Sequence, residues 1–272
     1  MDAKPVPSYK NPPVIEVVWS VQFAQLPWFT ASHLGLFWEL IRADYPRCEE
    51  QAPIERKDEP EELLQAPQVT IKMLDKPPLC RQWFISPAGN DLVQLQADRL
   101  CVNWRKVREG DAYPRYNHMR GIFAKRWEQF CSFAKAEGCE FPNVDLLEMT
   151  YVNHIFKGEG WSSPKDIGQV FPAISFHEES AFLPPPASLG CNMVFDVRGT
   201  QGRLHVSCRH AKLLEGDQRE LFRLELVARG RPARAEPDGL LEWFAAAREW
   251  IVRGFADLTK QEIQDKDWGR EQ

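Results

Sequence analysis

The chain reads Ile15-Glu16-Val17-Val18-Trp19-Ser20-Val21-Gln22-Phe23, and this stretch decides how the rest of the sequence is interpreted. Large apolar residues stand at every second position of the stretch. Because successive side chains of a strand point to opposite faces of a sheet, the alternation predicts a strand with one buried and one wet face. We expect the apolar set to be buried, namely Ile15, Val17, Trp19, Val21 and Phe23. We expect the polar set to face water, namely Glu16, Ser20 and Gln22.

Similar patterns predict the other elements of the chain. Alternation predicts further strands, at 69–73, 82–86, 92–97, 100–105, 147–156, 191–198, 203–210 and 220–228. Helical spacing of apolar residues predicts helices over 34–45, 114–136 and 239–258, the last with Asp238 as N-cap. A short helix should follow Ser163, with Pro164 at its first position. The acidic stretch 49–62 and the proline-rich stretch 177–190 are expected to be solvated loops.

The predicted elements follow nearly the same order twice. A strand, a short helix, a meander of strands and a long helix fill residues 14–140, and a similar series fills residues 141–260. We interpret the chain as α+β, with two degenerate β-α-β(3–4)-α halves packed against each other and no residue-level repeat. Antiparallel sheets with helices on one face explain the alternation, in a TATA-binding-protein-like or helix-grip-like arrangement. Residues 1–13 would form an extended lead-in, and residues 261–272 a C-terminal tail.

Composition narrows the class of protein. The 272 residues carry 34 Lys and Arg against 39 Asp and Glu, and the net charge of −5 argues against a generally basic nucleic-acid coat protein. The seven cysteines are widely spaced and lack a Cys-x-x-Cys pair, which fits buried thiols in a reducing cytosol. The sequence opens without an apolar signal core, and Gln, Pro and His interrupt the uncharged run 17–38. We therefore expect a cytoplasmic protein with no membrane partner.

Three short segments carry a resemblance to a known group of proteins. They are Asn11-Pro12-Pro13-Val14-Ile15-Glu16, then Tyr151-Val152-Asn153, and finally Phe255-Ala256-Asp257-Leu258-Thr259 with Trp268-Gly269 just beyond. In order and spacing they resemble a sporadically distributed family of uncharacterised bacterial and archaeal proteins. That family often has Arg before the tyrosine, where this chain has Thr150. The resemblance implies no chemistry, and the patchy occurrence of the family implies an accessory or mobile-element role.

The sequence lacks the motifs of familiar catalytic and metal sites. It contains no His-Glu-x-x-His, no phosphate-binding Gly-x-x-x-x-Gly-Lys and no Gly-x-Ser-x-Gly. Cys208 and His210 share a strand face and are the best pair of metal ligands, but two ligands make no site and Cys208 is more simply a core residue. Gly158-Glu159-Gly160 has Ser163 where a dinucleotide-binding loop would have its third glycine. We therefore expect no catalytic, cofactor-binding or metal-binding residues.

Two basic stretches are the main candidates for binding a partner. Residues 81–126 carry nine Lys or Arg against four acids, and residues 203–234 carry eight against four. They could contact a phosphate backbone, although a solvated face balanced by the acidic stretch 49–62 is the simpler interpretation. Arginines on the wet face of neighbouring strands would repel one another unless an acid or a bound anion compensates. The candidate partner-binding residues are Arg198, Arg203 and Arg209 on that face, and Trp161 in a predicted loop.

These observations favour a non-catalytic cytosolic binding or scaffold module. We expect it to act through a sheet face or a sheet edge on a protein partner or on a second copy of itself. The alternative is a nucleic-acid-associated accessory protein of a defence or toxin–antitoxin system, and an enzyme with an unfamiliar site is a third class. A salt-dependent mobility shift with generic DNA and RNA distinguishes the first two.

Overall fold

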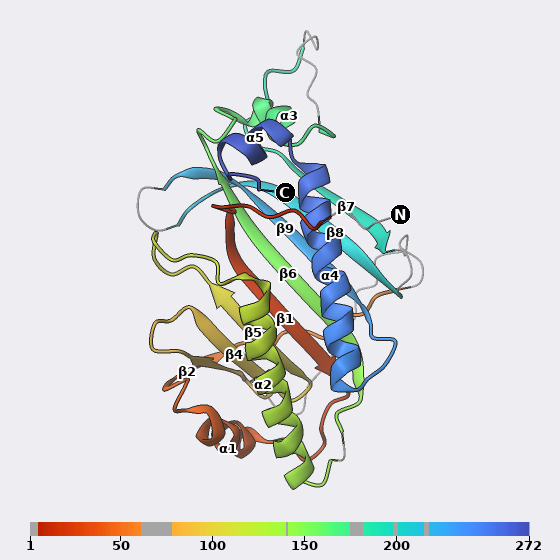
Figure 1. Cartoon of the computed structure of the whole chain (residues 1–272). Coiled ribbons are helices and arrows are strands. Elements are labelled where there is room, and N and C mark those ends of the chain that lie inside the picture. Colours follow the sequence, from red (N-terminus) through yellow and green to blue (C-terminus); the bar gives the residue numbers. More distant parts are fainter. Residues whose placement is uncertain are drawn as a thin grey trace.

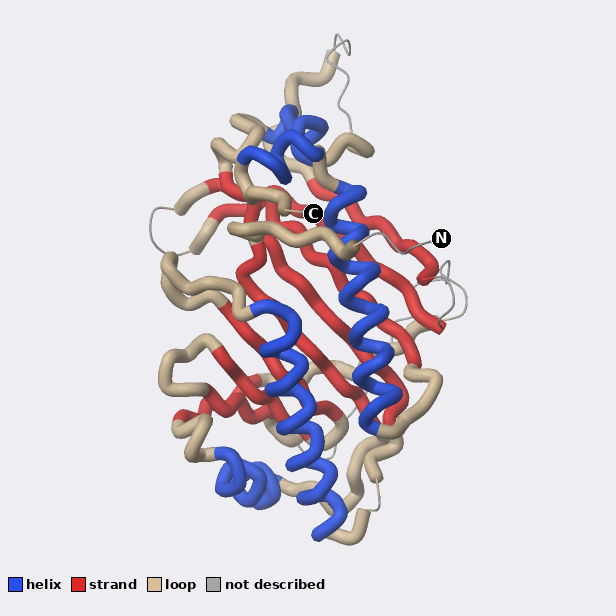
Figure 2. Tube along the Cα trace, in the orientation of Figure 1, coloured by secondary structure: helices blue, strands red, loops and turns tan. Residues whose placement is uncertain are grey.

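The computed structural model describes residues 5–60, 78–139, 141–174, 182–197, 201–214 and 218–271, with only the backbone of Gln201. These residues form an α+β molecule, as expected, in which one antiparallel sheet carries the two long helices on the same face (Figure 1, Figure 2). The described strands are β1 (Val14–Phe23), β2 (Arg47–Gln51), β3 (Arg81–Ile85), β4 (Asp91–Gln96), β5 (Arg99–Arg105), β6 (Val144–Phe156), β7 (Gly190–Val197), β8 (Gln201–Lys212) and β9 (Glu220–Arg231). The described helices are α1 (Ala31–Ile41), α2 (Arg115–Ala136), α3 (Ile167–Val170), α4 (Pro237–Leu258) and α5 (Gln261–Lys266), with a 3₁₀ turn at Pro164–Asp166.

The sheet is continuous across the molecule. Its nine described strands run in the order β2-β3-β4-β5-β1-β6-β9-β8-β7, and each neighbouring pair is antiparallel. β1 and β6 therefore meet at the centre, whereas β2 and β7 are the two edges. The sheet therefore has two surfaces. We call the surface that α2 and α4 cover the helix face, and the opposite surface the back face.

The core lies between the helix face and the helices α2 and α4. Trp19, from β1, stacks on Phe244 of α4 with ring centroids 4.6 Å apart and lies 5.3 Å from Phe123 of α2. The predicted stripes of both helices are buried, namely Met119, Phe123, Trp127, Phe130 and Ala134 in α2 and Leu240, Phe244, Ala247, Ile251 and Phe255 in α4. Among the described helices, none has both the length and the apolar character that a bilayer crossing requires.

The predicted apolar face of β1 is confirmed except at its first residue. Val17, Trp19, Val21 and Phe23 are completely buried. Ile15 is only half-buried, because an irregularity in the pairing of β1 with β6 falls between Val14 and Glu16 and turns Val14 toward the core instead.

The predicted wet face of β1 is wrong for two of its three residues. Ser20 and Gln22 are 2% and 3% exposed, and only Glu16 is half-exposed. The reason is that residues 52–60, expected to be solvated, lie across the back face and cover it. We call this segment the acidic strap. Gln22 donates from Nε2 to the carbonyl of Lys57 (2.9 Å) and accepts from the Lys57 N–H (2.8 Å). The Gln22 side chain therefore satisfies the Lys57 backbone as the backbone of a neighbouring strand would.

Several other boundaries differ from the predictions. The start of the acidic stretch is not a loop, since it contains the edge strand β2. Glu236 rather than Asp238 is the N-cap of α4, because Pro237 already occupies the first helical position. The predicted capping of the short helix by Ser163 is confirmed. The predicted strand 69–73 and part of the loop 177–190 lie outside the described residues.

The described part of the predicted C-terminal tail, residues 261–271, contains α5 and pairs with the lead-in. Tyr9 and Arg270 form an antiparallel bridge, and the N–H of Lys10 donates to the carbonyl of Gly269 at 3.0 Å. Tyr9 itself is buried, with its hydroxyl 3.0 Å from Oε1 of Gln264 and its ring edge-on to Phe255. Figure 1 shows the red N-terminal segment passing close to the C-terminus. The two segments together cover one end of the helix face.

Candidate functional site

Arg203 lies on the back face, where its partner is the chain's own acidic strap. Its guanidinium donates to Oε1 of Glu59 (2.9 Å) and to Oδ1 of Asp196 (3.0 Å), and it also bonds the carbonyl of Pro60. The other carboxylate oxygen of Glu59 lies 2.8 Å from Nε2 of His205. The compensating acid expected for this arginine is therefore supplied from within the molecule.

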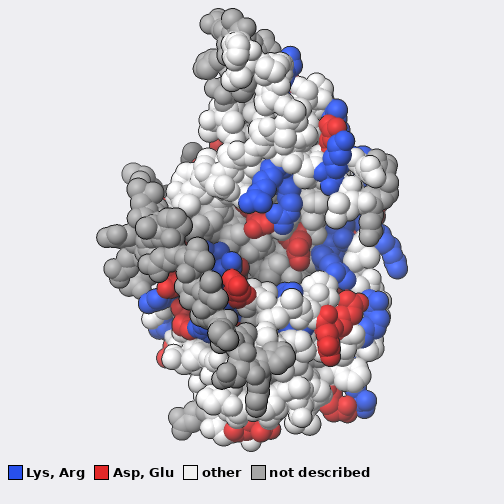
Figure 3. All heavy atoms as spheres, turned by 180° about the vertical axis from the view of Figure 1, so that it is seen from behind, with Lys and Arg blue, Asp and Glu red and all other residues white. Residues whose placement is uncertain are grey.

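The structure describes one of the other two predicted arginines, Arg209, and it lies apart from Arg203. Arg198 lies outside the described residues. Arg209 is on the same strand face as Arg203 but six residues further along, a separation of about 20 Å in an extended strand. It is exposed and faces Arg223 in the strand register. Figure 3 shows acidic and basic groups interspersed over the back face rather than one basic surface.

Trp161 is a core residue, so its predicted role as a contact residue is wrong. It is buried, its indole N–H donates to the carbonyl of Ile155 (3.3 Å), and its ring lies 4.3 Å from that of Phe222. The loop folds inward because Gly158 and Gly160 have positive φ angles, and a Cβ at Gly160 would come within 2.4 Å of Ile263.

Cys208 and His210, which the sequence analysis considered as metal ligands and set aside, belong to the packing of the molecule. Cys208 is buried in the core, and the His210 ring packs against Trp161 and Phe222. Within the described part of the chain, His, Cys, Asp and Glu side chains form no group of three that could hold a metal ion.

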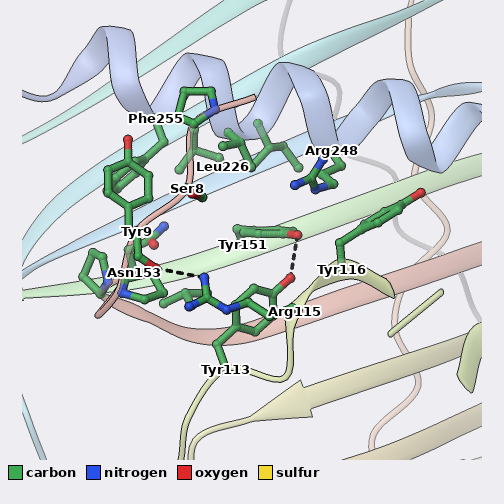
Figure 4. Close-up of a pocket in the computed structure, with 16 residues that line it drawn as sticks. Ser8, Tyr9, Tyr113, Arg115, Tyr116, Tyr151, Asn153, Leu226, Arg248 and Phe255 are labelled. Atoms are coloured by element: carbon green, nitrogen blue, oxygen red, sulfur yellow. Dashed lines mark hydrogen bonds between the residues drawn. The ribbon is translucent and has the colours of Figure 1, made fainter. Parts of the chain in front are cut away.

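A pocket of about 150 Å³ lies on the helix face between the lead-in, α4 and the start of α2 (Figure 4). It is lined by the lead-in and the start of β1, by the segment 113–116, by β6 and by α4. Tyr113 and Tyr151 face each other in it, with hydroxyl oxygens 2.9 Å apart. Burial raises the pKa of the Tyr113 hydroxyl and holds that of Tyr151 well above its usual range, so both are neutral phenols.

Two arginines reach the pocket from opposite sides. Arg248 extends from α4, and its guanidinium lies 4.9 Å from the ring centroid of Tyr116. Arg115 donates from Nη1 to the carbonyl of Tyr9 (2.9 Å), which ties the lead-in to the start of α2. Its φ of +72° is in the left-handed region, which costs a non-glycine residue about 1–3 kcal/mol. Such strain persists only where the surrounding structure holds it in place.

The three segments of the family resemblance meet at this pocket. Pro12 and Pro13 come from the first segment, Tyr151 and Asn153 from the second, and Phe255 from the third. Asn153 is buried and donates to the carbonyl of Leu224 at 3.3 Å, the structural role expected of a buried amide. Comparison of the chain with family models, with curated proteins and with solved structures finds no match. Membership of the sporadic family therefore stays a prediction.

The two edges of the sheet differ in chemistry. β2 carries Arg47, Glu49 and Glu50 among its five residues, whereas Asp196 is the single charged residue of β7. On β7, the side chains of Val194 and Phe195 are 39% and 41% exposed. Charged side chains protect an edge strand from pairing with another chain. Among the described residues, β2 is therefore protected and nothing pairs with the outer side of β7.

Sequence reasoning missed both the pocket and the open edge. The charge pattern gave no clear signal for the edge, since the predicted strands 191–198 and 203–210 each carry two charged residues. The pocket had a weak signal, the gathering of Tyr113, Arg115 and Tyr116 just before and within the first turn of a predicted helix. Only the tertiary structure brings them to Tyr151.

Proposed function

We propose that the protein is a non-catalytic binding module whose β7 edge accepts a strand from a protein partner, here a second copy of the chain. The observation that carries this proposal is the open edge at β7. Strand addition uses the unpaired N–H and C=O groups of an edge, and pockets for alternate side chains give it specificity. A two-fold pairing of β7 with itself would close the assembly as a dimer and leave the charged β2 edges apart.

A groove beside β7 supports this proposal. It has a volume of about 660 Å³ and lies between β7, β8 and α4. Phe195 and Met193 line it from the edge strand, opposite Trp250 and Leu258 of α4. Side chains on the helix face of an added strand would enter this groove and bury its apolar wall.

Arg209 has a place in the proposed pairing. Gly190 stands opposite Arg209 in the register of β7 and β8, and the Arg209 side chain leans over the space where Gly190 has no Cβ. An antiparallel self-pairing centred on Met193 sets Gly190 of one copy opposite Asp196 of the other. Arg209 of one copy would then lie beside the Asp196 carboxylate of the other copy across the new interface.

We also propose that the fold arose by a degenerate duplication. Counting outward from the centre, β1-β5-β4-β3 corresponds to β6-β9-β8-β7, and α2 corresponds to α4. The divisions would be residues 14–140 and 141–260, as expected from the element order. In this scheme β2 is the extra strand of the first half, which fits its role as a charged cover for the edge at β3.

The alternative, a nucleic-acid-associated accessory protein, has less support. Cations of both basic stretches are paired inside the molecule, for example Arg126 with Asp44 and Arg229 with Glu148. A mobility shift of generic DNA or RNA that falls steeply with salt would favour this alternative. Any role in a defence or toxin–antitoxin system rests on that result.

The experiment for the edge proposal is a concentration series by light scattering after size-exclusion chromatography. We expect a dimer for the wild type, a monomer for Val194→Lys with Phe195→Lys, and a weakened dimer for Arg209→Glu. Cys48→Lys puts a new positive charge on the exposed β2 edge and should leave the dimer intact. A wild type that stays monomeric, or a dimer that survives both lysines on β7, contradicts the proposal.

A further inference from the structure

The pocket under the lead-in presents hydrogen-bond donors without a matching acid. Of the sixteen residues that line it, none is Asp or Glu, while Arg115 and Arg248 are both present. The rest of the lining is largely apolar, with Val14, Leu226 and Ile251 among it. A largely apolar pocket with cations and no acid among its lining residues favours an anion supplied from outside the chain.

The tyrosine pair adds a donor to this set. Two phenols carry two hydroxyl protons, and the contact between Tyr113 and Tyr151 uses one of them. Among the described residues, none accepts the second proton. Whichever hydroxyl donates to the other, one O–H remains available at the pocket.

Arg248 is the principal charge. Its guanidinium stacks on the Tyr116 ring, and within the described chain it has neither a hydrogen-bond acceptor nor a carboxylate partner. Stacking leaves the edge of the guanidinium, with its fork of N–H donors, open to a planar anion. It also lies near both tyrosines, since its charge lowers the pKa of Tyr113 and Tyr151 against the larger effect of burial. Figure 4 shows it extending from α4 toward Tyr151.

We propose that this pocket binds a carboxylate group borne on a compact apolar body. The carboxylate would take the N–H fork of Arg248 and the spare tyrosine O–H, while the apolar body would lie against Val14, Leu226 and Ile251. A cavity of about 150 Å³ accepts a single benzene-sized ring. One free guanidinium suits a singly charged carboxylate better than a phosphate dianion, because Arg115 is already engaged by the Tyr9 carbonyl.

This site is separate from the β7 edge, so the inference does not depend on the proposed dimer. The same carboxylate chemistry has two sources, a free small acid or the terminal carboxylate of a protein chain that ends in an apolar residue. Both would fill the pocket in the same way, and they differ only in what lies outside it.

The test is isothermal titration of the full chain with benzoate, with benzyl alcohol as the uncharged ring and with inorganic phosphate as the anion without a ring. We expect saturable one-to-one binding of benzoate at millimolar concentrations and at least tenfold weaker binding of the other two. Arg248→Gln and the double variant Tyr113→Phe with Tyr151→Phe should each weaken benzoate binding, the first by tenfold or more. Arg42→Gln, at an exposed arginine just beyond α1 and outside the pocket lining, is the matched control and should bind benzoate as the wild type does.

Circular dichroism melts establish that each variant is folded, and the double tyrosine variant keeps the test valid if Arg248→Gln does not fold. Benzyl alcohol binding as tightly as benzoate, phosphate competing with benzoate, or wild-type binding retained in both variants would overturn the proposal. Absence of benzoate binding would overturn it as well. A short peptide ending in phenylalanine, as the free acid and as the amide, assigns the source. Tighter binding of the peptide acid indicates a protein chain end, and tighter binding of benzoate indicates a small metabolite.

Discussion

Oε1 of Glu59 lies 2.9 Å from Nη1 of Arg203, which follows it by 144 positions in the chain. The Glu59 side chain is 5% exposed although it belongs to the most acidic part of the sequence. This contact holds the acidic strap at Glu59. Hydrogen bonds between the side chains of Gln22 and Gln96 and the backbone of Lys57 and Ile54 hold the rest of the strap. The back face of the sheet is therefore closed by the chain itself over much of its width.

Replacing Gln22 with leucine should release the middle of the strap. The buried amide makes two hydrogen bonds to the backbone of Lys57, and leucine would leave both backbone groups without a partner. We expect the free energy of unfolding to fall by about 1–3 kcal/mol in urea denaturation. Gln25→Leu, at an exposed position just beyond β1, should change it little. Equal midpoints for the two variants would mean that the strap contributes nothing to stability.

Glu59→Gln should open the strap locally without unfolding the protein. It weakens the contacts with Arg203, His205 and Arg229 that hold the end of the segment. Trypsin cleavage after Arg56 and Lys57 should then accelerate several-fold under native conditions, because cleavage follows local opening. Glu55→Gln removes the same charge from an exposed position of the strap and should not change the rate. Identical cleavage rates in the two variants would count against this account.

The contribution of Asp44 to stability should disappear in acid. Hydrogen bonds from Arg126 and then Lys125 hold the pKa of the Asp44 carboxyl at about 2, below its ordinary 3.8. A lowered folded-state pKa stabilises the protein above the unfolded value, and that stabilisation is lost as the pH falls through the folded value. Asp44→Asn should therefore destabilise the protein near neutral pH, with a difference from wild type that shrinks between pH 4 and pH 2.

A pH series of urea denaturation curves measures this difference. Glu39→Gln, which breaks an exposed pair with Arg42 on α1, is the control and should cost little at any pH. If the difference in free energy of unfolding between wild type and Asp44→Asn stayed constant down to pH 2, the ionised Asp44 carboxylate would not be the source of that difference.

Phe255→Ala should destabilise the protein by about 3–5 kcal/mol, as expected for a buried aromatic side chain. The Phe255 ring lies 5.0 Å from that of Trp268 and 5.6 Å from that of Tyr9, so its loss affects α4 and both segments that cover the pocket. The control is Phe182→Ala, because Phe182 is 91% exposed. The midpoints of thermal or urea denaturation should differ clearly between the two variants. A Phe255→Ala midpoint equal to that of the wild type would mean that this end of the apolar stripe of α4 makes no stabilising contacts.

The secondary structure and much of the core could be predicted because their signals are local. Alternation identified β1 and the hairpin of β4 and β5, and helical spacing identified the stripes of α2 and α4. The acidic strap could not be predicted in this way. Its charges have no partners nearby in the sequence, and Arg203 and Arg229 become partners only when β8 and β9 join the sheet.

The candidate site was predicted less well than the fold. Arg203 was placed on the correct face, but its anion belongs to the same chain, and Trp161 is buried because two glycines turn its loop inward. The pocket depends on contacts between residues such as Tyr9 and Gln264, which are 255 positions apart. The positive φ of Arg115 follows from that assembly and not from its neighbours in sequence.

The bridge between Tyr9 and Arg270 also sets an order of events during synthesis. The segment that covers the pocket precedes β1 in the chain, yet the residues that hold it in place follow α5 and are therefore made after it. The sheet and α2 can form earlier, whereas the pocket is complete only once residues 268–271 are available. A chain without residues 268–271 could therefore form the sheet and α2 and still leave the lead-in over the pocket unanchored.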